Sequence, residues 1–444
     1  MKIRTLLAVA LLVSFSGTVY AELQNVEVGG SIRIRGDYFR FDSLGNQSFV
    51  EQRTRLHVKA DFTNDVSAFI EMDSYGNWGD DFRSWYLCGN DFAAKRRDEV
   101  QMYQAYINVK GLWGTPLSLR VGRQEISLGN QFLVGVNDKS SLFKGLSFDA
   151  VRLTYATDQV KVDAIASKLA ETFQNFGKGD VDFYTVYGSY IGLDDVVFNA
   201  YWMYVRDDQG DIVALANGKT LGEHTFGLRS AGRLGSFDFE AEGAYQLGRV
   251  NGVKNPWFNV LDQDADVKYN TFAANSEVGY NFDIAWQPRP FARFAYLGGG
   301  KPDSSFWTND RTMPFDRLFS NIQYSEFLDG YTANNGKLSN VFVYGLGLQL
   351  RPTECISLRL LGSYIRAEKK LCSHIHDSKD VGWEVGISGD YHYSDDLVFR
   401  AGYSHFFGRA GLETPPIRWS GLIPWQASRK DQYDYVFGET EISF

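Results

Sequence analysis

The sequence contains no hydrophobic run long enough to form a membrane-spanning helix in its mature part. Such a helix needs about 20 consecutive apolar residues. Charged or polar residues interrupt every apolar stretch after residue 21 well before that length. This absence excludes a protein built from transmembrane helices.

Cysteine is also scarce, with only Cys88, Cys355 and Cys372 in the chain. Their spacing matches neither a CxxC motif nor a zinc site, and three cysteines form no disulfide framework. At most one disulfide bridge is possible.

Familiar catalytic motifs are missing. None of the six histidines lies in an HExxH motif, and there is no G-x-S-x-G segment. His374 and His376 lie beside Cys372 and Asp377, a group that we interpret as the polarity of a solvated loop, with a metal site as the alternative. We predict that the protein is not an enzyme and has no cofactor and no metal.

The chain lacks an excess of positive charge, and its N-terminus is typical of an exported protein. Lys2 and Arg4 precede an apolar segment at 6–13, and Ala21 precedes Glu22, as in a cleaved signal peptide. Losing these two positive charges changes the net charge from −9 to −11, which argues against nucleic acid or anionic lipid as a partner. We predict a signal peptide at 1–21 and a single domain at 22–444, with an internal strand or an anchor helix as the alternative for the leader.

Alternating apolar and polar residues predict strands. Residues 117–121 (LSLRV) and 151–155 (VRLTY) are two such runs, separated by a polar loop that contains glycine. In each run the arginine, Arg120 or Arg152, faces away from the aliphatic side of its strand. The apolar face would be the core of a soluble sandwich or the lipid-facing side of an outer-membrane barrel.

Two earlier runs, 26–37 and 51–62, separate charge from apolar side chains more strongly. Their basic residues fall on the face opposite the aliphatic ones: Arg33, Arg35, Arg53, Arg55 and Lys59. A Lys or Arg that faces lipid at the bilayer midplane costs roughly 2–4 kcal/mol. In a membrane barrel these side chains must therefore face inward; the alternative is the solvated face of a soluble sheet.

The connections between strands favour the barrel. Short turns such as 63–65 and 393–396 alternate with long polar loops such as 76–98 and 299–338. Counting the segments between them predicts an all-β transmembrane antiparallel barrel of about 18 strands, with short periplasmic turns and long extracellular loops. Cys88 and Cys372 would then share the extracellular side and could pair, whereas Cys355 could not reach them.

The C-terminal strand supports an outer-membrane location in a Gram-negative-type cell. The chain ends E-T-E-I-S-F, and Val436, Ile442 and Phe444 share one face of this strand. A terminal phenylalanine on an amphipathic strand resembles the assembly signature of Gram-negative outer-membrane proteins.

Several ordered patches add a family resemblance. They are LRVGRQE (119–125), FDAVRL (148–153), FDRLFS (315–320), KDVGWEVGISGDY (379–391) and GYSHFFG (402–408). With the barrel pattern and the terminal phenylalanine, they make the chain resemble the alginate-export family of outer-membrane porins. The resemblance implies a barrel of about 18 strands whose narrow, arginine-lined lumen passes an extended polyuronate.

The matched patches and the inward faces nominate pore-lining, substrate-binding residues. Arginine suits this role because it grips a carboxylate with two parallel hydrogen bonds and stays charged. The candidates are Arg33, Arg35, Arg53, Arg55, Lys59, Arg120, Arg123, Gln124, Arg152 and Glu384, with Arg293, Arg359 and Arg400 as further lumen-facing arginines. We expect Glu384 to hold arginines in place. For each arginine the alternative is an ordinary lumen charge that pairs with a neighbouring acid.

We therefore predict an outer-membrane channel that passes an anionic polysaccharide such as alginate, or related acidic sugars. Its other partners would be outer-membrane lipid and periplasmic export components, without nucleic acid. Asp238, Glu240 and Glu242 also face the lumen by the same alternation, so a general diffusion porin and a structural or adhesive barrel stay open as alternatives. The sequence does not decide whether loop 299–338 plugs or gates the pore.

Overall fold

The computed structural model describes most of the chain. The described residues are 22–41, 45–78, 100–136, 138, 145–171, 180–208, 220–253, 265–300, 311–331, 338–369, 378–409 and 432–444. The predicted signal peptide, the Cys88–Cys372 pair and the cluster at 372–377 lie outside them. Cys355 is described, and it is a free, exposed cysteine.

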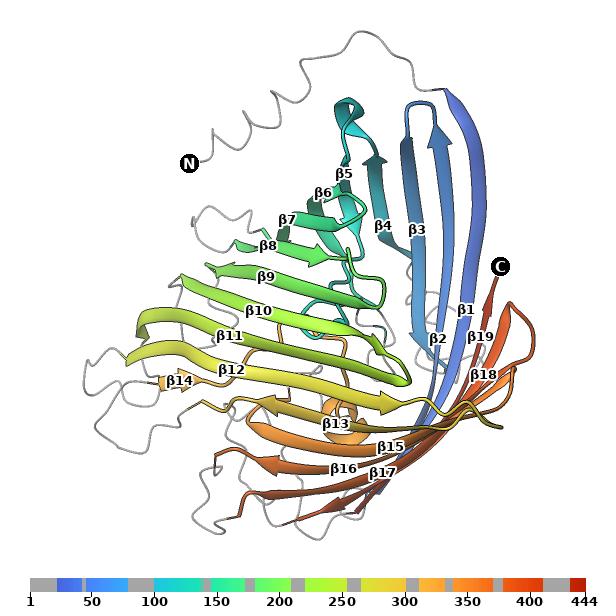
Figure 1. The fold of residues 1–444 in the computed structure, drawn as a ribbon, viewed down its shortest axis with the longest axis vertical. Helices are drawn as coiled ribbons and strands as arrows, with labels where there is room; N and C mark the ends of the chain where they lie inside the picture. The colour runs from blue at the N-terminus through green and yellow to red at the C-terminus, as the bar shows by residue number, and fades with distance from the viewer. Residues whose placement is uncertain are drawn as a thin grey trace, which may run out of the picture.

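The described chain is almost entirely β-structure (Figure 1). Its strands are β1 (Leu23–Phe41), β2 (Gly45–Phe62), β3 (Val66–Asn77), β4 (Val100–Val109), β5 (Leu117–Gln124), β6 (Phe148–Ala156), β7 (Val160–Ala170), β8 (Val181–Tyr190), β9 (Val196–Asp207), β10 (Leu221–Leu234), β11 (Phe237–Val253), β12 (Ala265–Tyr280), β13 (Arg289–Leu297), β14 (Arg311–Met313), β15 (Val341–Thr353), β16 (Ile356–Ala367), β17 (Asp380–His392), β18 (Leu397–Gly408) and β19 (Gln432–Ser443). A 3-10 turn, η3 (Leu112–Gly114), and a π-helical turn, η4 (Glu326–Tyr331), complete the elements. No helix among the described residues is long and apolar enough to cross a membrane.

The strands form a closed antiparallel barrel. Each wall strand pairs with its neighbour in sequence, and β1 pairs with both β2 and β19. The three-residue strand β14 pairs only with β12, in parallel, while β13 pairs directly with β15. The wall therefore has 18 strands, as predicted.

The seam of the barrel joins the two ends of the described chain. The backbone N–H of Gly30 donates to the carbonyl of Phe444 at 2.8 Å, and the N–H of Phe444 donates to the carbonyl of Gly30 at 3.0 Å. A Cβ at position 30 would lie 2.5 Å from the Arg55 carbonyl oxygen and 3.0 Å from the Phe444 ring. Glycine therefore permits the close approach that brings β2 and the C-terminal residue together at β1.

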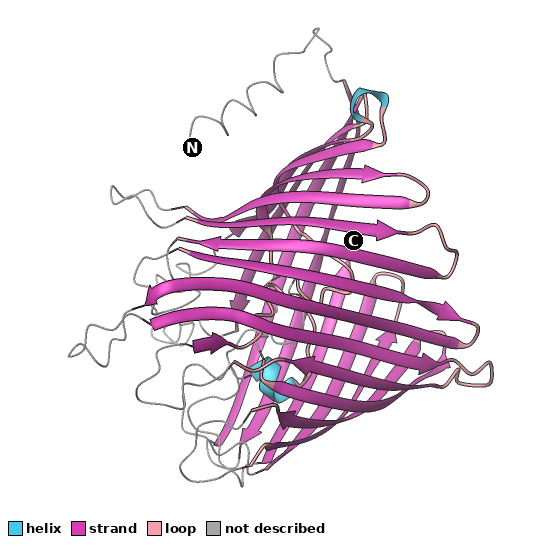
Figure 2. Ribbon diagram, turned by 60° about the vertical axis from the view of Figure 1, so that its left-hand side comes forward, coloured by secondary structure: helices cyan, strands magenta, loops and turns pink. Residues whose placement is uncertain are grey.

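The connections between strands at one end of the barrel are short turns, as Figure 2 shows. Between β2 and β3, Asn64 and Asp65 both have positive φ, of 63° and 57°. They belong to the three-residue turn 63–65, which joins the Phe62–Val66 pair, and Asn and Asp adopt this conformation at a lower cost than most residues. The position of this turn can therefore be predicted from the residue types at positions 64 and 65.

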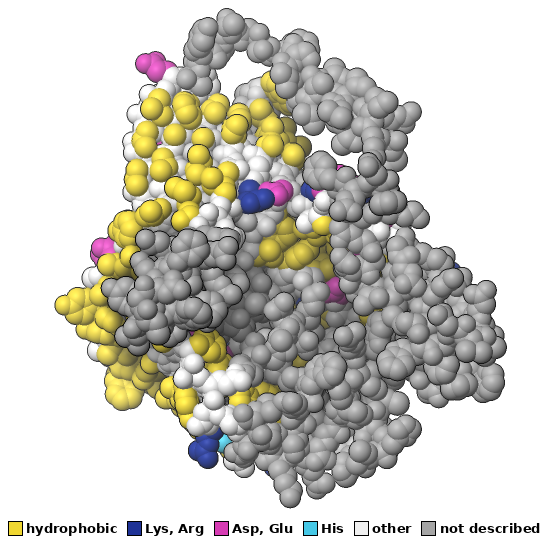
Figure 3. All heavy atoms as spheres, turned by 180° about the vertical axis from the view of Figure 1, so that it is seen from behind, with side chains coloured by type: hydrophobic (Ala, Val, Ile, Leu, Met, Phe, Trp, Pro, Cys, Tyr) yellow, Lys and Arg dark blue, Asp and Glu magenta, His cyan; other side chains and the backbone are white. Residues whose placement is uncertain are grey.

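Burial is inverted relative to a soluble protein. Large apolar side chains such as Val28, Leu228 and Leu346 are 72%, 68% and 73% exposed on the outside, whereas Arg35 and Arg53 are 2% and 3% exposed on the inside. Figure 3 shows one part of this apolar outer surface. Because successive strand residues point to opposite faces, the alternation of apolar and polar residues in the sequence produces an apolar exterior and a charged interior.

Candidate functional site

The first group of inward arginines lies on adjacent strands β1 and β2. Arg33 stands opposite Arg53 in the strand register, and Arg55 stands opposite Ser31. Arg33, Arg35, Arg53 and Arg55 are all at most 7% exposed. We call these four residues the basic wall.

Carboxylates from distant parts of the chain neutralise the basic wall. One oxygen of Asp138 accepts hydrogen bonds from Arg33 and Arg53, each at 2.7 Å. Glu439 of β19 lies 2.8 Å from Arg33 and 3.0 Å from Arg35. A buried charge without a partner would cost several kcal/mol, so these acids allow the arginines to stay buried.

Arg55, the fourth residue of the basic wall, contacts a different set of side chains. It pairs with Asp73 at 3.2 Å and with Glu125 at 3.5 Å, and its guanidinium lies 3.7 Å from the centre of the Tyr103 ring. Burial raises the pKa of the Glu125 carboxyl, while the Tyr103 hydroxyl and the Arg55 charge offset part of this rise. Residue 125 begins the segment that follows β5, so this pair ties that segment to the wall.

Four other predicted residues lie on inward faces but apart from the basic wall. Lys59 is partly exposed and pairs with Asp61 at 3.0 Å. Arg120 lies 4.4 Å from the centre of the Tyr106 ring. The other two are Gln124, whose buried amide donates to the Gly122 and Ala150 carbonyls, and Arg152, which pairs with Asp163 at 2.9 Å.

Arg123 lies on the outer face of the barrel, which differs from its predicted place in the lumen. It forms two hydrogen bonds with Asp149, of 2.7 and 2.9 Å, and the neighbouring pair on the same face is Val121 and Val151. Val121 and Val151 are exposed apolar residues of the outer surface. Residues three positions apart in a strand face opposite sides, so Arg120 and Arg123 cannot both point inward.

Two segments from the long-loop end fold into the lumen and pair with each other. The first follows β5, and the second is residues 314–331 of loop 299–338, which come after β14. Phe319 exchanges backbone hydrogen bonds with Leu133 (2.8 Å) and Gly135 (3.0 Å), and the N–H of Asn321 donates to the Gln131 carbonyl at 2.9 Å. We call residues 314–331 the inner segment.

Side chains from opposite sides of the barrel fix the inner segment. On one side, the Phe319 ring packs edge-on against Phe148 of β6 and Phe183 of β8. On the other, Phe327 stacks on Tyr433 of β19, with ring centres 3.8 Å apart. Contact with both sides means that the segment crosses the interior, as the helical turn inside the barrel in Figures 1 and 2 illustrates.

The inner segment also has a charged core of its own. Arg317 pairs with Asp329 at 2.6 Å, and neither side chain is exposed. Arg317 also lies 4.8 Å from the centre of the Tyr324 ring, and Asp329 accepts the N–H of Tyr324 at 2.8 Å. The sequence left open where this loop lies; the structure pairs β14 with wall strand β12 and places the inner segment inside the barrel.

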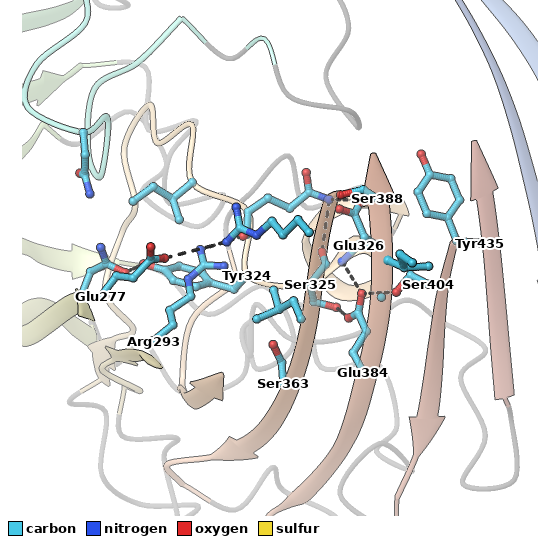
Figure 4. Close-up of a pocket in the computed structure, with 18 of the residues that line it drawn as sticks. Glu277, Arg293, Tyr324, Ser325, Glu326, Ser363, Glu384, Ser388, Ser404 and Tyr435 are labelled. Atoms are coloured by element: carbon cyan, nitrogen blue, oxygen red, sulfur yellow. Dashed lines mark hydrogen bonds and ion pairs between the residues drawn. The ribbon is translucent and has the colours of Figure 1, made fainter. Parts of the chain in front are cut away.

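Glu384 anchors the inner segment rather than an arginine. Its carboxylate accepts hydrogen bonds from the Ser325 hydroxyl, from the Glu326 N–H at 2.8 Å and from the Ser404 hydroxyl at 2.8 Å. Figure 4 shows these three donors around it. The expectation that Glu384 holds arginines is therefore wrong, because its neighbours are set by a loop 58 and 59 residues earlier in the chain.

A cavity of about 550 Å³ lies between the inner segment and the wall, in the half of the barrel nearer the short turns. Arg289 and Arg293 of β13 and Arg359 of β16 line it, together with hydroxyl, amide and carboxylate side chains. In Figure 4, Arg293, Glu277 and Tyr324 lie on one side and Glu326, Ser388 and Ser404 on the other. The cavity is therefore polar. Two of its cations, Arg293 and Arg359, are among the further lumen-facing arginines predicted from sequence, whereas Arg289 was not predicted.

Comparison with known proteins settles the family. Residues 24–411 match a family model described as alginate export. The chain belongs to the alginate export family. As a closed barrel of this family, the protein is an outer-membrane channel. No match was found among curated proteins.

Solved structures with the same fold accompany the alginate export match. Pseudomonas aeruginosa OccK2 (OpdF) in complex with glucuronate has a TM-score of 0.56 at 10% identity, covering 94% of this chain and 98% of that chain. Pseudomonas aeruginosa OccK11 (OpdR) has a TM-score of 0.55 at 12% identity, covering 97% and 99%. At such low identity the likeness shows the barrel fold alone.

Sequence reasoning missed the acids that partner the basic wall and the contacts of the inner segment. Asp138 lies 105 residues from Arg33 in the chain and carries no local signal of that contact. Arg317, by contrast, lies within the FDRLFS patch, and this patch of the alginate export resemblance proves to be part of the inner segment. That patch was the one signal in the sequence for the interior loop.

Proposed function

We propose that the protein passes an anionic saccharide of the polyuronate class, such as alginate, through its lumen. The observation that carries this proposal is the set of inward arginines, in the basic wall and in the cavity, inside a barrel whose interior is crossed by the inner segment. A polyanion that enters a narrow channel loses water and needs fixed cations along its path. Arginine supplies them because its guanidinium binds carboxylates bidentately and does not deprotonate.

Family membership and the charge pattern support the substrate class together. The family model is described as alginate export, and the solved barrel of OccK2 (OpdF), with the same fold, holds glucuronate. Acids at Asp238 and Glu240 are paired with Arg289 and Arg229, so the acidic face of β11 is largely neutralised. This pairing favours an anion path over the alternative of a general diffusion porin.

The test is current blockade in planar bilayers. We expect soluble alginate to reduce the single-channel current by occupying the lumen, and we expect neutral dextran of similar size to have little effect. The open channel should also prefer anions in reversal-potential measurements. Equal blockade by dextran would refute the polyuronate substrate while leaving a porin, and the absence of any current would favour a structural or adhesive barrel.

A further inference from the structure

Two of the three cavity arginines, Arg293 and Arg359, have far less counter-charge than the arginines of the basic wall. Arg289 takes two carboxylates, pairing with Asp238 and with Glu277, the latter at 3.0 Å. Among the described residues, the only carboxylate within ion-pair distance of Arg359 is that same Glu277, at 3.9 Å. Three guanidinium groups and two carboxylates therefore make up this cluster. Glu240, Glu326 and Glu384 also line the cavity, but they contact Arg229, Gln323 and the Ser325 and Ser404 hydroxyls instead.

Arg293 is the least paired member of this cluster. Within the described part of the chain no carboxylate lies within ion-pair distance of it, and its recorded contacts are the backbone carbonyl of Gln323, at 3.0 Å, and the ring of Tyr324. Nε of Arg359 is buried and has no hydrogen-bond partner among the described residues. A buried donor without a partner costs free energy that a ligand oxygen would recover.

Strand register brings these cations into one place. Arg289 stands opposite Gln349 of β15, and Gln349 stands opposite Arg359 of β16. Arg293, four residues after Arg289 on β13, shares its face. The guanidinium groups thus approach the cavity from two wall strands beneath the inner segment, and the Phe291 ring lies within 5.2 Å of both Arg289 and Arg359.

We infer that this cavity is a binding subsite for the carboxylate of a single sugar-acid unit, held between Arg293 and Arg359. The rest of the lining suits a polyhydroxylated ligand, since Asn275, Ser363 and Ser388 offer amide and hydroxyl groups to sugar hydroxyls. The carboxylates Glu277 and Glu326 disfavour a dianion such as phosphate. The volume lies in the range of sites that hold small organic ligands.

The subsite rests on the proposed function, and a binding measurement tests it separately from transport. Glucuronate serves as the probe, added to the detergent-solubilised barrel and followed by titration calorimetry, with glucose as the neutral comparison. Arg293→Gln and Arg359→Gln should each weaken glucuronate binding by roughly tenfold, the effect of losing a charge-assisted hydrogen bond. Arg400→Gln is the matched control, because it removes a lumen arginine that already pairs with Glu439 and Glu441.

The outcomes separate the two ideas. Unchanged glucuronate binding in both cavity variants, or equal weakening in Arg400→Gln, would overturn the subsite, even if the channel keeps its preference for anions. Equal affinity for glucose would overturn it as well. A barrel that binds glucuronate through Arg293 and Arg359 but shows neither anion preference nor alginate blockade would keep the subsite and refute the proposed transport function. Resistance of the folded barrel to unfolding in SDS checks that each variant is assembled.

Discussion

The two groups of arginines inside the barrel differ in their counter-charges. Each arginine of the basic wall has a carboxylate within 3.2 Å. In the cavity, Arg359 has its nearest recorded carboxylate at 3.9 Å, and Arg293 has none within ion-pair distance among the described residues. Pairing therefore separates Arg293 and Arg359 from the basic wall, whereas Arg289 of the cavity is paired with Asp238 and Glu277.

Burial explains why the two groups can differ. The side chains of Arg35 and Arg53 are each 3% exposed, whereas that of Arg359 is 39% exposed. A deeply buried guanidinium needs an acid to offset the loss of water, while a partly hydrated one can persist without a close partner. The basic wall is thus a closely paired network that holds Asp138, and the cavity retains arginines with capacity for a ligand.

The largest effect is expected from breaking the core of the inner segment. Arg317→Met leaves Asp329 buried without its partner, which costs roughly 3–5 kcal/mol in comparable buried pairs. We expect the segment to leave its place in the lumen and the single-channel conductance to rise severalfold, with added current noise. Both can be read in planar bilayers.

A double variant makes this prediction specific. Arg317→Met combined with Asp329→Leu replaces the ion pair by apolar groups, an exchange that is often close to neutral in stability. Conductance should therefore return toward that of the natural chain. If Arg317→Met alone leaves conductance unchanged, the inner segment does not limit the open lumen.

The second prediction addresses the basic wall. Changing Arg53 and Arg55 to Glu replaces two positive charges with two negative ones, and at an effective dielectric of about 20 a charge pair 4 Å apart is worth about 4 kcal/mol. After screening by pore water, we expect the anion-to-cation permeability ratio to fall by roughly tenfold. Reversal potentials in a salt gradient measure this ratio.

A companion variant should act in the opposite direction. Asp138→Asn removes the acid that bridges Arg33 and Arg53, so the permeability ratio should rise by a smaller factor. If both variants leave the ratio unchanged, the basic wall does not face the ion path, and the cavity would be the more important group.

Most of the fold could be predicted because its signals are local. Alternation assigns each strand residue to a face, turn residues such as Asn64 and Asp65 mark the hairpins, and the alternation of short and long connections gives the wall of 18 strands. The same alternation places Arg33, Arg53 and Arg152 on inward faces. These inferences need no knowledge of what lies across the barrel.

The contacts of the site could not be predicted because they depend on chain folding across the lumen. Glu384 meets Ser325, 59 residues earlier in the chain, and Arg33 meets Asp138, 105 residues later. The residues of a long loop do not determine whether it folds outward or into the lumen. Nothing local in the sequence shows that loop 299–338 turns inward. The prediction for Arg123 was wrong for another reason: it rested on the LRVGRQE patch of the family resemblance, whereas strand alternation places Arg120 and Arg123 on opposite faces.

The smallest expected effect on the permeability ratio comes from a comparison of two arginines on opposite faces of one strand. Arg120 and Arg123 both belong to β5, but Arg120 faces the Tyr106 ring inside, and Arg123 pairs with Asp149 outside. Arg120→Gln removes a lumen charge and should lower the permeability ratio measurably, though less than the change at Arg53 and Arg55. Arg123→Gln removes an exposed pair of a kind worth about 0–1 kcal/mol and should leave the ratio unaltered. A shift of the same size in both variants would mean that Arg123 lines the ion path, and the register between β5 and β6 would then have to be reassigned.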